Sequence, residues 1–243
     1  MHAPVTSLLL LALLAAAPAA QPPAAARAEF IKKTYLHLAA AVVAFIALEG
    51  ALLSSPLGAV IARSLLGTRW GWLLVLGAFM LVGNVAQRWA ASGHSVGMQY
   101  AGLGLYVVAE AIIFVPLLYV AANFAGPGII PQAGLYTLLV FTGLTGTVFF
   151  TRRDFSWLRT ALTVASFAAL GLIIVSMIFG FSLGTLFMAA MVALAAGYVL
   201  YSTSNVLHHY PVGSHVAAAL ALFSAVALMF WYIVQLLMSR SRN

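Results

Sequence analysis

Two carboxylic acids lie within long apolar stretches, where an ionised side chain is costly. Glu49 lies about 15 residues into the first stretch, or about 22 Å along a helix, and Glu110 about 12 residues into the third, or about 18 Å along. No stretch contains a Lys or Arg that could pair with them. Each acid must therefore be protonated, hydrogen-bonded to hydroxyl groups, or neutralised by a passing cation. We interpret Glu110, near the midplane, and Glu49 as candidates for an ion or proton path. The alternative is a neutral acid bonded to a neighbouring helix.

A second group of titratable residues lies between the last two apolar stretches. His208 and His209 follow the stretch 184–205, and His215 opens the stretch 214–238. Imidazole titrates near neutral pH, so this pair could sense pH or bind a metal ion, although the sequence defines no metal site. Because adjacent histidines at a helix end point in different directions, an ordinary capping or interfacial role is the alternative.

The composition requires a lipid solvent around these groups. Hydrophobic residues make up 64% of the 243-residue chain and charged residues 6%, whereas soluble domains have about 25% charged residues. The net charge of +7 arises from basic residues between apolar stretches, as in membrane loops, so we expect no nucleic-acid partner. The chain has no cysteine, which excludes disulfides and thiolate chemistry.

Seven apolar stretches predict an all-α fold of seven transmembrane helices. They cover residues 34–54, 70–87, 98–123, 133–150, 160–180, 184–205 and 214–238, separated by Gly, Pro and Ser. We divide the chain into an N-terminal extension (1–30), a transmembrane domain (31–238) and a short basic tail (239–243). The extension contains a signal-like apolar segment, and both a cleaved leader and a loose or interfacial segment remain open.

The distribution of basic residues predicts the orientation in the membrane. With a cytoplasmic N-terminus, seven Lys and Arg residues lie on the cytoplasmic side and four on the other. The cytoplasmic seven are Arg27, Lys32, Lys33, Arg88, Arg152, Arg153 and Arg159, and the other four are Arg63, Arg69, Arg240 and Arg242. The loop that holds His208 and His209 is then cytoplasmic.

The loop TRRDFSWL, residues 151–158, also lies on that side. Asp154, followed by Ser156, predicts an N-cap for the fifth helix. The sequence contains no HExxH, P-loop or GxSxG motif, and its one Asp is interfacial. We therefore expect no enzyme activity and no cofactor, with calcium present only as a permeant ion.

The TRRDFSWL loop, the tail GYVLYSTSNVLHHY…AAALALFSAVALMFWYI and the opening FIKKTYLHLAAAV together resemble the Bax inhibitor-1 family, bacterial members in particular. The resemblance covers about residues 27–238. It implies a seven-helix bundle whose last helix is central and is surrounded by three helix pairs. It also implies a pH-controlled calcium leak, and an association with cell-death suppression or with a bacterial membrane quality-control protease in the inner membrane.

This chain departs from the family at the residues that close the pore. In leak-competent members an Asp in a Tyr-Asp-Thr motif shares a proton with a second Asp in the last helix. Here these positions are Ser202, between Tyr201 and Thr203, and Ala225. Because neither is acidic, the family's pH mechanism does not transfer residue by residue. Glu110 is our candidate for a replacement carboxylate.

Two functional hypotheses follow. In the first, the protein passes or regulates calcium or protons around the last helix, with Tyr201, Thr203, His208 and His209 at the cytoplasmic mouth. In the second, it is a non-conducting membrane protein that binds a partner such as a protease. The loss of both acids of the family's pair favours this second hypothesis. A solute transporter would need broken helices at midplane, and only Pro116 interrupts a stretch.

Overall fold

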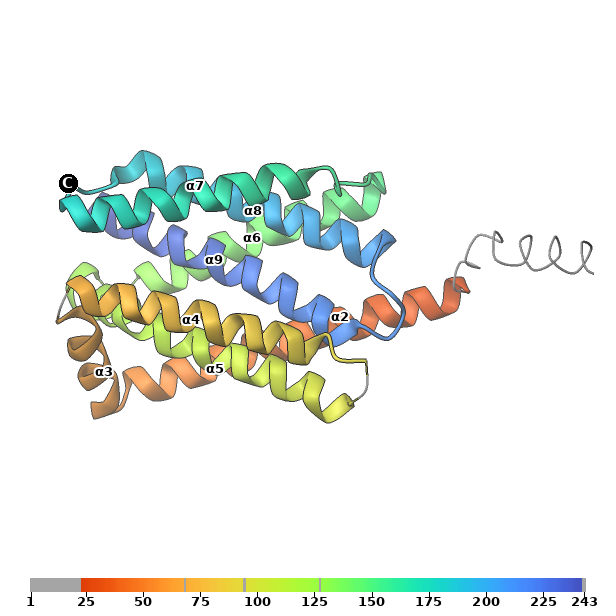
Figure 1. The fold of residues 1–243 in the computed structure, drawn as a ribbon, viewed down its shortest axis with the longest axis horizontal. Coiled ribbons are helices and arrows are strands. Elements are labelled where there is room, and N and C mark those ends of the chain that lie inside the picture. Colours follow the sequence, from red (N-terminus) through yellow and green to blue (C-terminus); the bar gives the residue numbers. More distant parts are fainter. Residues whose placement is uncertain (1–22, 68, 94, 127, 242–243) are drawn as a thin grey trace, which may run out of the picture.

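The computed structural model describes residues 23–67, 69–93, 95–126 and 128–241, and these residues form helices without a strand (Figure 1). The elements are α2 (Ala24–Leu53), α3 (Pro56–Leu66), α4 (Arg69–Ala90), α5 (Val96–Val120), the π-helical turn η1 (Ala121–Ala125), α6 (Ile129–Thr151), α7 (Leu158–Phe179), α8 (Gly184–His208) and α9 (His215–Ser241).

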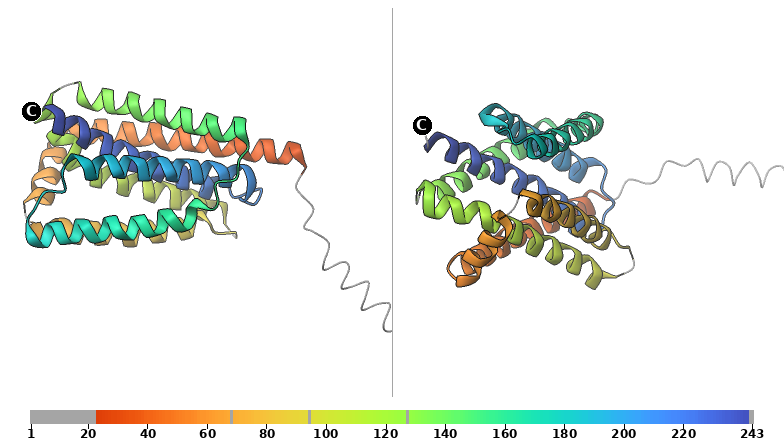
Figure 2. Two further views of the ribbon diagram at one scale, coloured as in Figure 1. Left: turned by 90° about the horizontal axis from the view of Figure 1, so that it is seen from above. Right: turned by 60° about the vertical axis from the view of Figure 1, so that its left-hand side comes forward.

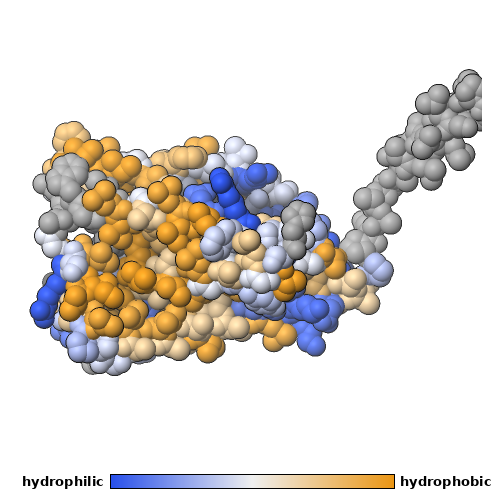
Figure 3. All heavy atoms as spheres, turned by 60° about the horizontal axis from the view of Figure 1, so that its bottom comes forward, coloured by the Kyte–Doolittle hydropathy of each residue, from blue (hydrophilic) through white to orange (hydrophobic). Residues whose placement is uncertain are grey.

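Six helices of the described part are long and apolar enough to cross a membrane. They are α2, α5 with η1, α6, α7, α8 and α9. The remaining predicted stretch, 70–87, lies in α4. The apolar part of this helix, Leu74–Ala90, is shorter than the six long helices. The prediction of an all-helical, multi-pass membrane fold is therefore confirmed, and the seventh crossing stays a prediction. Figure 3 shows a broad hydrophobic surface on one face, as expected of a lipid-facing bundle.

The long helices run roughly along one axis, and α3 lies across one end of the bundle (Figure 2). Helices α2, α5, α7 and α9 begin at the end from which α2 projects, which we call the basic end. All seven residues predicted to share the cytoplasmic side are at this end, from Arg27 to Arg159. Arg63, Arg69 and Arg240 are at the other end, which we call the distal end. Arg242 lies outside the described residues.

Helix α9 is the centre of the packing. It contacts α2, α4, α5, α6 and α8, and side chains such as Leu222, Met229 and Val234 are fully buried. The prediction that the last helix is central agrees with these contacts. Helix α7, in contrast, packs on α8 at the edge of the bundle (Figure 1). The grouping of the other helices into three pairs stays a prediction.

The N-terminal part differs from the predicted boundaries. Helix α2 begins at Ala24 rather than near residue 34, and Lys33 pairs with Glu29 one turn earlier, at 3.6 Å. The end of the predicted extension is thus helical, while the signal-like segment lies outside the described residues. Helix α3 was not predicted, although Pro56 in its first turn is a typical helix start.

Candidate functional site

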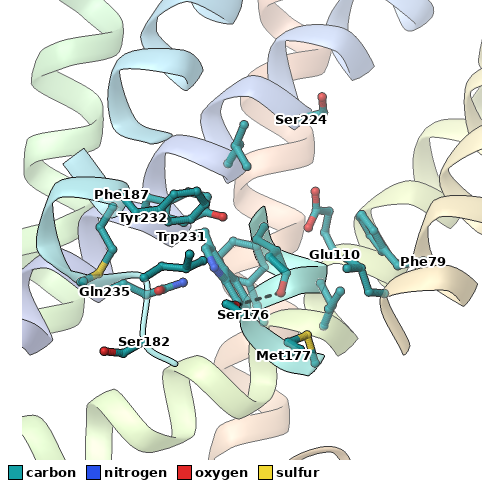
Figure 4. Close-up of a pocket in the computed structure, with 18 of the residues that line it drawn as sticks. Phe79, Glu110, Ser176, Met177, Ser182, Phe187, Ser224, Trp231, Tyr232 and Gln235 are labelled. Atoms are coloured by element: carbon teal, nitrogen blue, oxygen red, sulfur yellow. Dashed lines mark hydrogen bonds between the residues drawn. The ribbon is translucent and has the colours of Figure 1, made fainter. Parts of the chain in front are cut away.

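Glu110 lies on the wall of a cavity of about 650 Å³. It is the fifteenth residue of α5, about 21 Å from the helix start, and 6% of the residue is exposed. Figure 4 shows this carboxyl group facing side chains of α9 across the cavity. From Glu110 the cavity extends to the α7–α8 connection (181–183), so it runs from mid-helix towards the distal end.

Two hydroxyl groups lie near the inner end of the cavity, and one of them, that of Tyr106, is beside this carboxyl group. The Tyr106 hydroxyl is next to both the Glu110 carboxyl group and the Ser224 hydroxyl. Tyr106 precedes Glu110 by one helical turn, which places both on one face of α5, and Ser224 comes from α9. The acid thus has one hydroxyl neighbour, which in turn lies next to a second hydroxyl group. None of the described residues lining the cavity is Lys, Arg or His.

The remaining wall of the cavity is mainly apolar, with several aromatic rings and a few polar groups. Phe79, Phe114, Phe187, Trp231 and Tyr232 contribute rings from α4, α5, α8 and α9. Polar side chains nearer the distal end are Ser176, Ser182 and Gln235. The cavity is therefore an apolar chamber with a single acidic group at its inner end.

Glu49 lies in a different place. It borders an apolar groove of about 780 Å³ between α2, α6 and α9. Glu49 is 4% exposed, and within the described structure neither of its carboxyl oxygens has a hydrogen-bond partner. Because α2 begins early, Glu49 is one turn from the helix end at Leu53 and hence near the distal end.

An aromatic layer separates the cavity from the groove. The ring of Phe114, which lines the cavity, is 5.1 Å from that of Phe45 and 5.8 Å from that of Phe230, which both line the groove. Phe223 adds contacts to Phe45 and to Tyr106. The structure therefore does not bring the two candidate carboxylates together.

The positions of the family's paired acids are buried in the packed half of the bundle towards the basic end. Ser202 is 5% exposed and Ala225 3%, and neither lines the cavity or the groove. Thr203 is fully buried, and the Tyr35 hydroxyl approaches it and Thr145 without a well-aligned hydrogen bond. Tyr201 lies near Tyr210 of the next loop.

Asp154 joins the α6–α7 loop to the end of α8. Its Oδ1 accepts from the Ser156 backbone N–H at 2.8 Å and from the Ser204 hydroxyl at 3.3 Å, and its Oδ2 is 2.9 Å from His209 Nε2. The Ser156 N–H is the main reason that the pKa of Asp154 falls to about 2, and His209 lowers it further. The predicted N-cap role is wrong, because α7 starts after Trp157 without a side-chain cap. Asp154 instead forms a turn within the loop.

The histidines at the basic end have separate partners. His208 Nδ1 lies 3.1 Å from the Ser204 carbonyl oxygen, whereas His209 pairs with Asp154. His37 and His215 pack with ring centres 4.8 Å apart, and His37 bonds Tyr100 at 2.8 Å. Within the described residues, no three acidic or imidazole groups cluster as a metal site would need.

Sequence reasoning missed most partners of these residues. The spacing of Tyr106 and Glu110 was a usable signal, since residues four apart share a helix face. The contacts of Asp154 with Ser204 and His209 span 50 and 55 residues and left no local signal.

The fold and the site together define a multi-pass helical membrane protein with a buried carboxyl group on the wall of a partly open cavity. Residues 27–242 match the family model described as "Inhibitor of apoptosis-promoting Bax1". The chain belongs to the Bax inhibitor-1 family, which confirms the resemblance seen in the sequence.

Two relatives illustrate the match. Bax inhibitor 1 of Schizosaccharomyces pombe is 30% identical over 175 residues, which cover 68% of this chain and 61% of that protein. The uncharacterized protein PA2604 of Pseudomonas aeruginosa is 31% identical over 117 residues, which cover 46% of this chain and 50% of that protein. The matched segments thus span about half to three fifths of the relatives' own lengths.

Proposed function

We propose that this Bax inhibitor-1-family protein passes a small cation, calcium or a proton, or controls its passage, through the Glu110 cavity. The observation that carries the proposal is a carboxyl group at mid-helix, at the inner end of a cavity whose described lining residues include no basic side chain. An acid buried in a membrane protein is costly, and such residues usually face an ion or proton pathway.

In this proposal Glu110 attracts the cation, and Tyr106 and Ser224 supply hydroxyl oxygens beside it. Glu49 has no role in the path, because the aromatic layer of Phe45, Phe114, Phe223 and Phe230 lies between it and the cavity. The basic end is cytoplasmic, by the excess of Lys and Arg there. The cavity then extends towards the opposite side of a bacterial inner membrane.

The test is calcium and proton flux in proteoliposomes across about pH 6 to 8. We expect Glu110→Gln to lower the flux by about tenfold or more, which corresponds to the loss of about 1.4 kcal/mol of favourable interaction with the cation. Glu49→Gln is the matched control, since it removes another buried acid on the far side of the aromatic layer, and its flux should stay within about twofold of the wild type. Equal flux in the wild type and Glu110→Gln would remove the proposal.

A second function has its own support. Ser202 and Ala225 are not acidic, are buried and do not line the cavity, so these positions provide no titratable pair to open a path. This favours a non-conducting protein that binds another membrane protein, for example a quality-control protease. Absence of calcium and proton flux, together with capture of one membrane protein by crosslinking in native membranes, would favour this function over the first.

A further inference from the structure

The Glu110 cavity is much larger than an inorganic ion requires. Its volume of about 650 Å³ falls within the range of about 300–1,000 Å³ that is typical of small-molecule sites. A bare ion or a proton would leave most of this space without a contact. The size alone favours an organic ligand over a single atom.

The cavity wall also differs from a site that holds calcium tightly, although calcium can still pass along it. Calcium takes about six to eight oxygen ligands, several of them carboxylates. Among the described residues that line the cavity, Glu110 is the one acid, and the nearby oxygens are mainly neutral hydroxyls such as those of Tyr106 and Ser224. A single negative charge matches a ligand with a single positive charge.

The aromatic side chains indicate what else the ligand carries. Rings of Phe79, Phe114, Phe187, Trp231 and Tyr232 line the same cavity, and Figure 4 shows Phe79 beside Glu110 and Trp231 and Tyr232 across from it. Aromatic faces attract ammonium groups, and they also pack well against the apolar part of a ligand. Since no Lys, Arg or His lines the described wall, nothing there repels a cation.

We propose that the cavity binds a hydrophobic organic ammonium ion, with its charged nitrogen at Glu110 and its apolar body between the aromatic side chains of α5, α8 and α9. The inference rests on the proposed function in that it takes the Glu110 cavity as the cation site, and it names the class of cation. The ammonium–carboxylate pair has no net charge, so its burial costs less than burial of either ion alone. Ser182 and Gln235 lie towards the distal end, where the ligand enters.

The test compares two probes that differ in charge and hardly in size. Binding of 4-phenylbutylamine, a cation at neutral pH, and of 4-phenylbutanol, its neutral analogue, is measured by calorimetry on the purified full chain in lipid nanodiscs. We expect the amine to bind about tenfold or more tightly than the alcohol, because hydrogen bonds to a charged group are the stronger ones. Equal affinity of the two probes, or no binding of the amine, would overturn the inference.

Three variants locate the site. Glu110→Gln should remove the preference for the amine, and Glu49→Gln should retain it. If the first variant does not fold, Ser224→Leu answers the same question, since it adds bulk to the cavity wall next to Tyr106, keeps the charge of Glu110 and should abolish binding of both probes. A preference for the amine that survives Glu110→Gln or Ser224→Leu in a folded protein would place binding elsewhere and sink the inference.

Failure of this inference can be told apart from failure of the proposed function. Amine binding at Glu110 without calcium or proton flux would discard only the inorganic cation. Flux that depends on Glu110, with no amine binding, would discard only the organic ligand.

Discussion

Gly102 lies at a close contact of helices α4 and α5, and its replacement tests the packing of these two helices, which both contribute residues to the cavity wall. A Cβ at this position would lie 2.5 Å from both the Ala86 carbonyl oxygen and the Ala90 nitrogen, and 2.9 Å from Trp89 Cβ. Two of these are backbone atoms, which cannot rotate away. Gly102→Ala must therefore push α4 and α5 apart.

The expected loss follows from two opposing contributions. Overpacking costs about 1–3 kcal/mol, and we take the upper value because the clash is with backbone. Replacing a helical Gly by Ala returns about 1 kcal/mol. The free energy of unfolding should fall by about 2 kcal/mol in total, which lowers Tm by about 4–8 °C in a protein of this size.

Thermal unfolding in detergent micelles measures this change, and Gly104→Ala is the matched control. A Cβ at Gly104, on the same helix, meets no atom within 4 Å, so this variant should be as stable as the wild type or more stable by up to about 1 kcal/mol. If both variants have the same Tm, the close contact of α4 and α5 is not present in the protein, and the cavity wall described above is wrong.

Two further predictions concern the other acids. Glu49→Met should raise the free energy of unfolding by about 1–3 kcal/mol, because it removes a buried carboxyl group without a hydrogen-bond partner among the described residues. A lower Tm for this variant than for the wild type would mean that Glu49 has a favourable partner. Asp154→Asn should lower stability by at most about 1 kcal/mol, since Asp154 is nearly half exposed. Because the pKa of Asp154 is lowered from 3.8 to about 2, this loss should be complete above about pH 4 and should vanish as the pH falls to about 2. Thermal unfolding across this pH range measures the loss. If Asp154→Asn is still less stable than the wild type below pH 2, the ionised carboxylate of Asp154 is not the cause of the loss.

The sequence was sufficient to predict the helices, because an apolar stretch without a charge has few alternatives to a membrane helix. Six of the seven predicted stretches correspond to long apolar helices. Boundaries were less certain where charged residues continue a helix beyond the apolar part. In α2, Glu29, Lys32 and Lys33 stay helical, and hydropathy alone does not register them.

The candidate site was predictable only in part. The depth of Glu110 followed from counting residues along its helix, and the structure places it in a cavity at mid-helix. The other wall, with Trp231, Tyr232 and Gln235, depends on how α9 is rotated against α5, which no local pattern sets. The same limit applied to Glu49, whose separation from Glu110 by an aromatic layer depends on the packing of three helices, α2, α5 and α9.

The chain contains no cysteine, so a single introduced thiol can report directly whether the Glu110 cavity is open to water. Glu110→Cys is treated in sealed vesicles with a membrane-impermeant, positively charged thiosulfonate, with Glu49→Cys as the control. The cavity, with its polar groups towards the distal end, predicts fast labelling at position 110 from that side, and little labelling is expected at position 49, which borders an apolar groove. Absence of labelling at position 110 from either side in a folded protein, or equal labelling at both positions, would contradict the assignment of this cavity as the cation site.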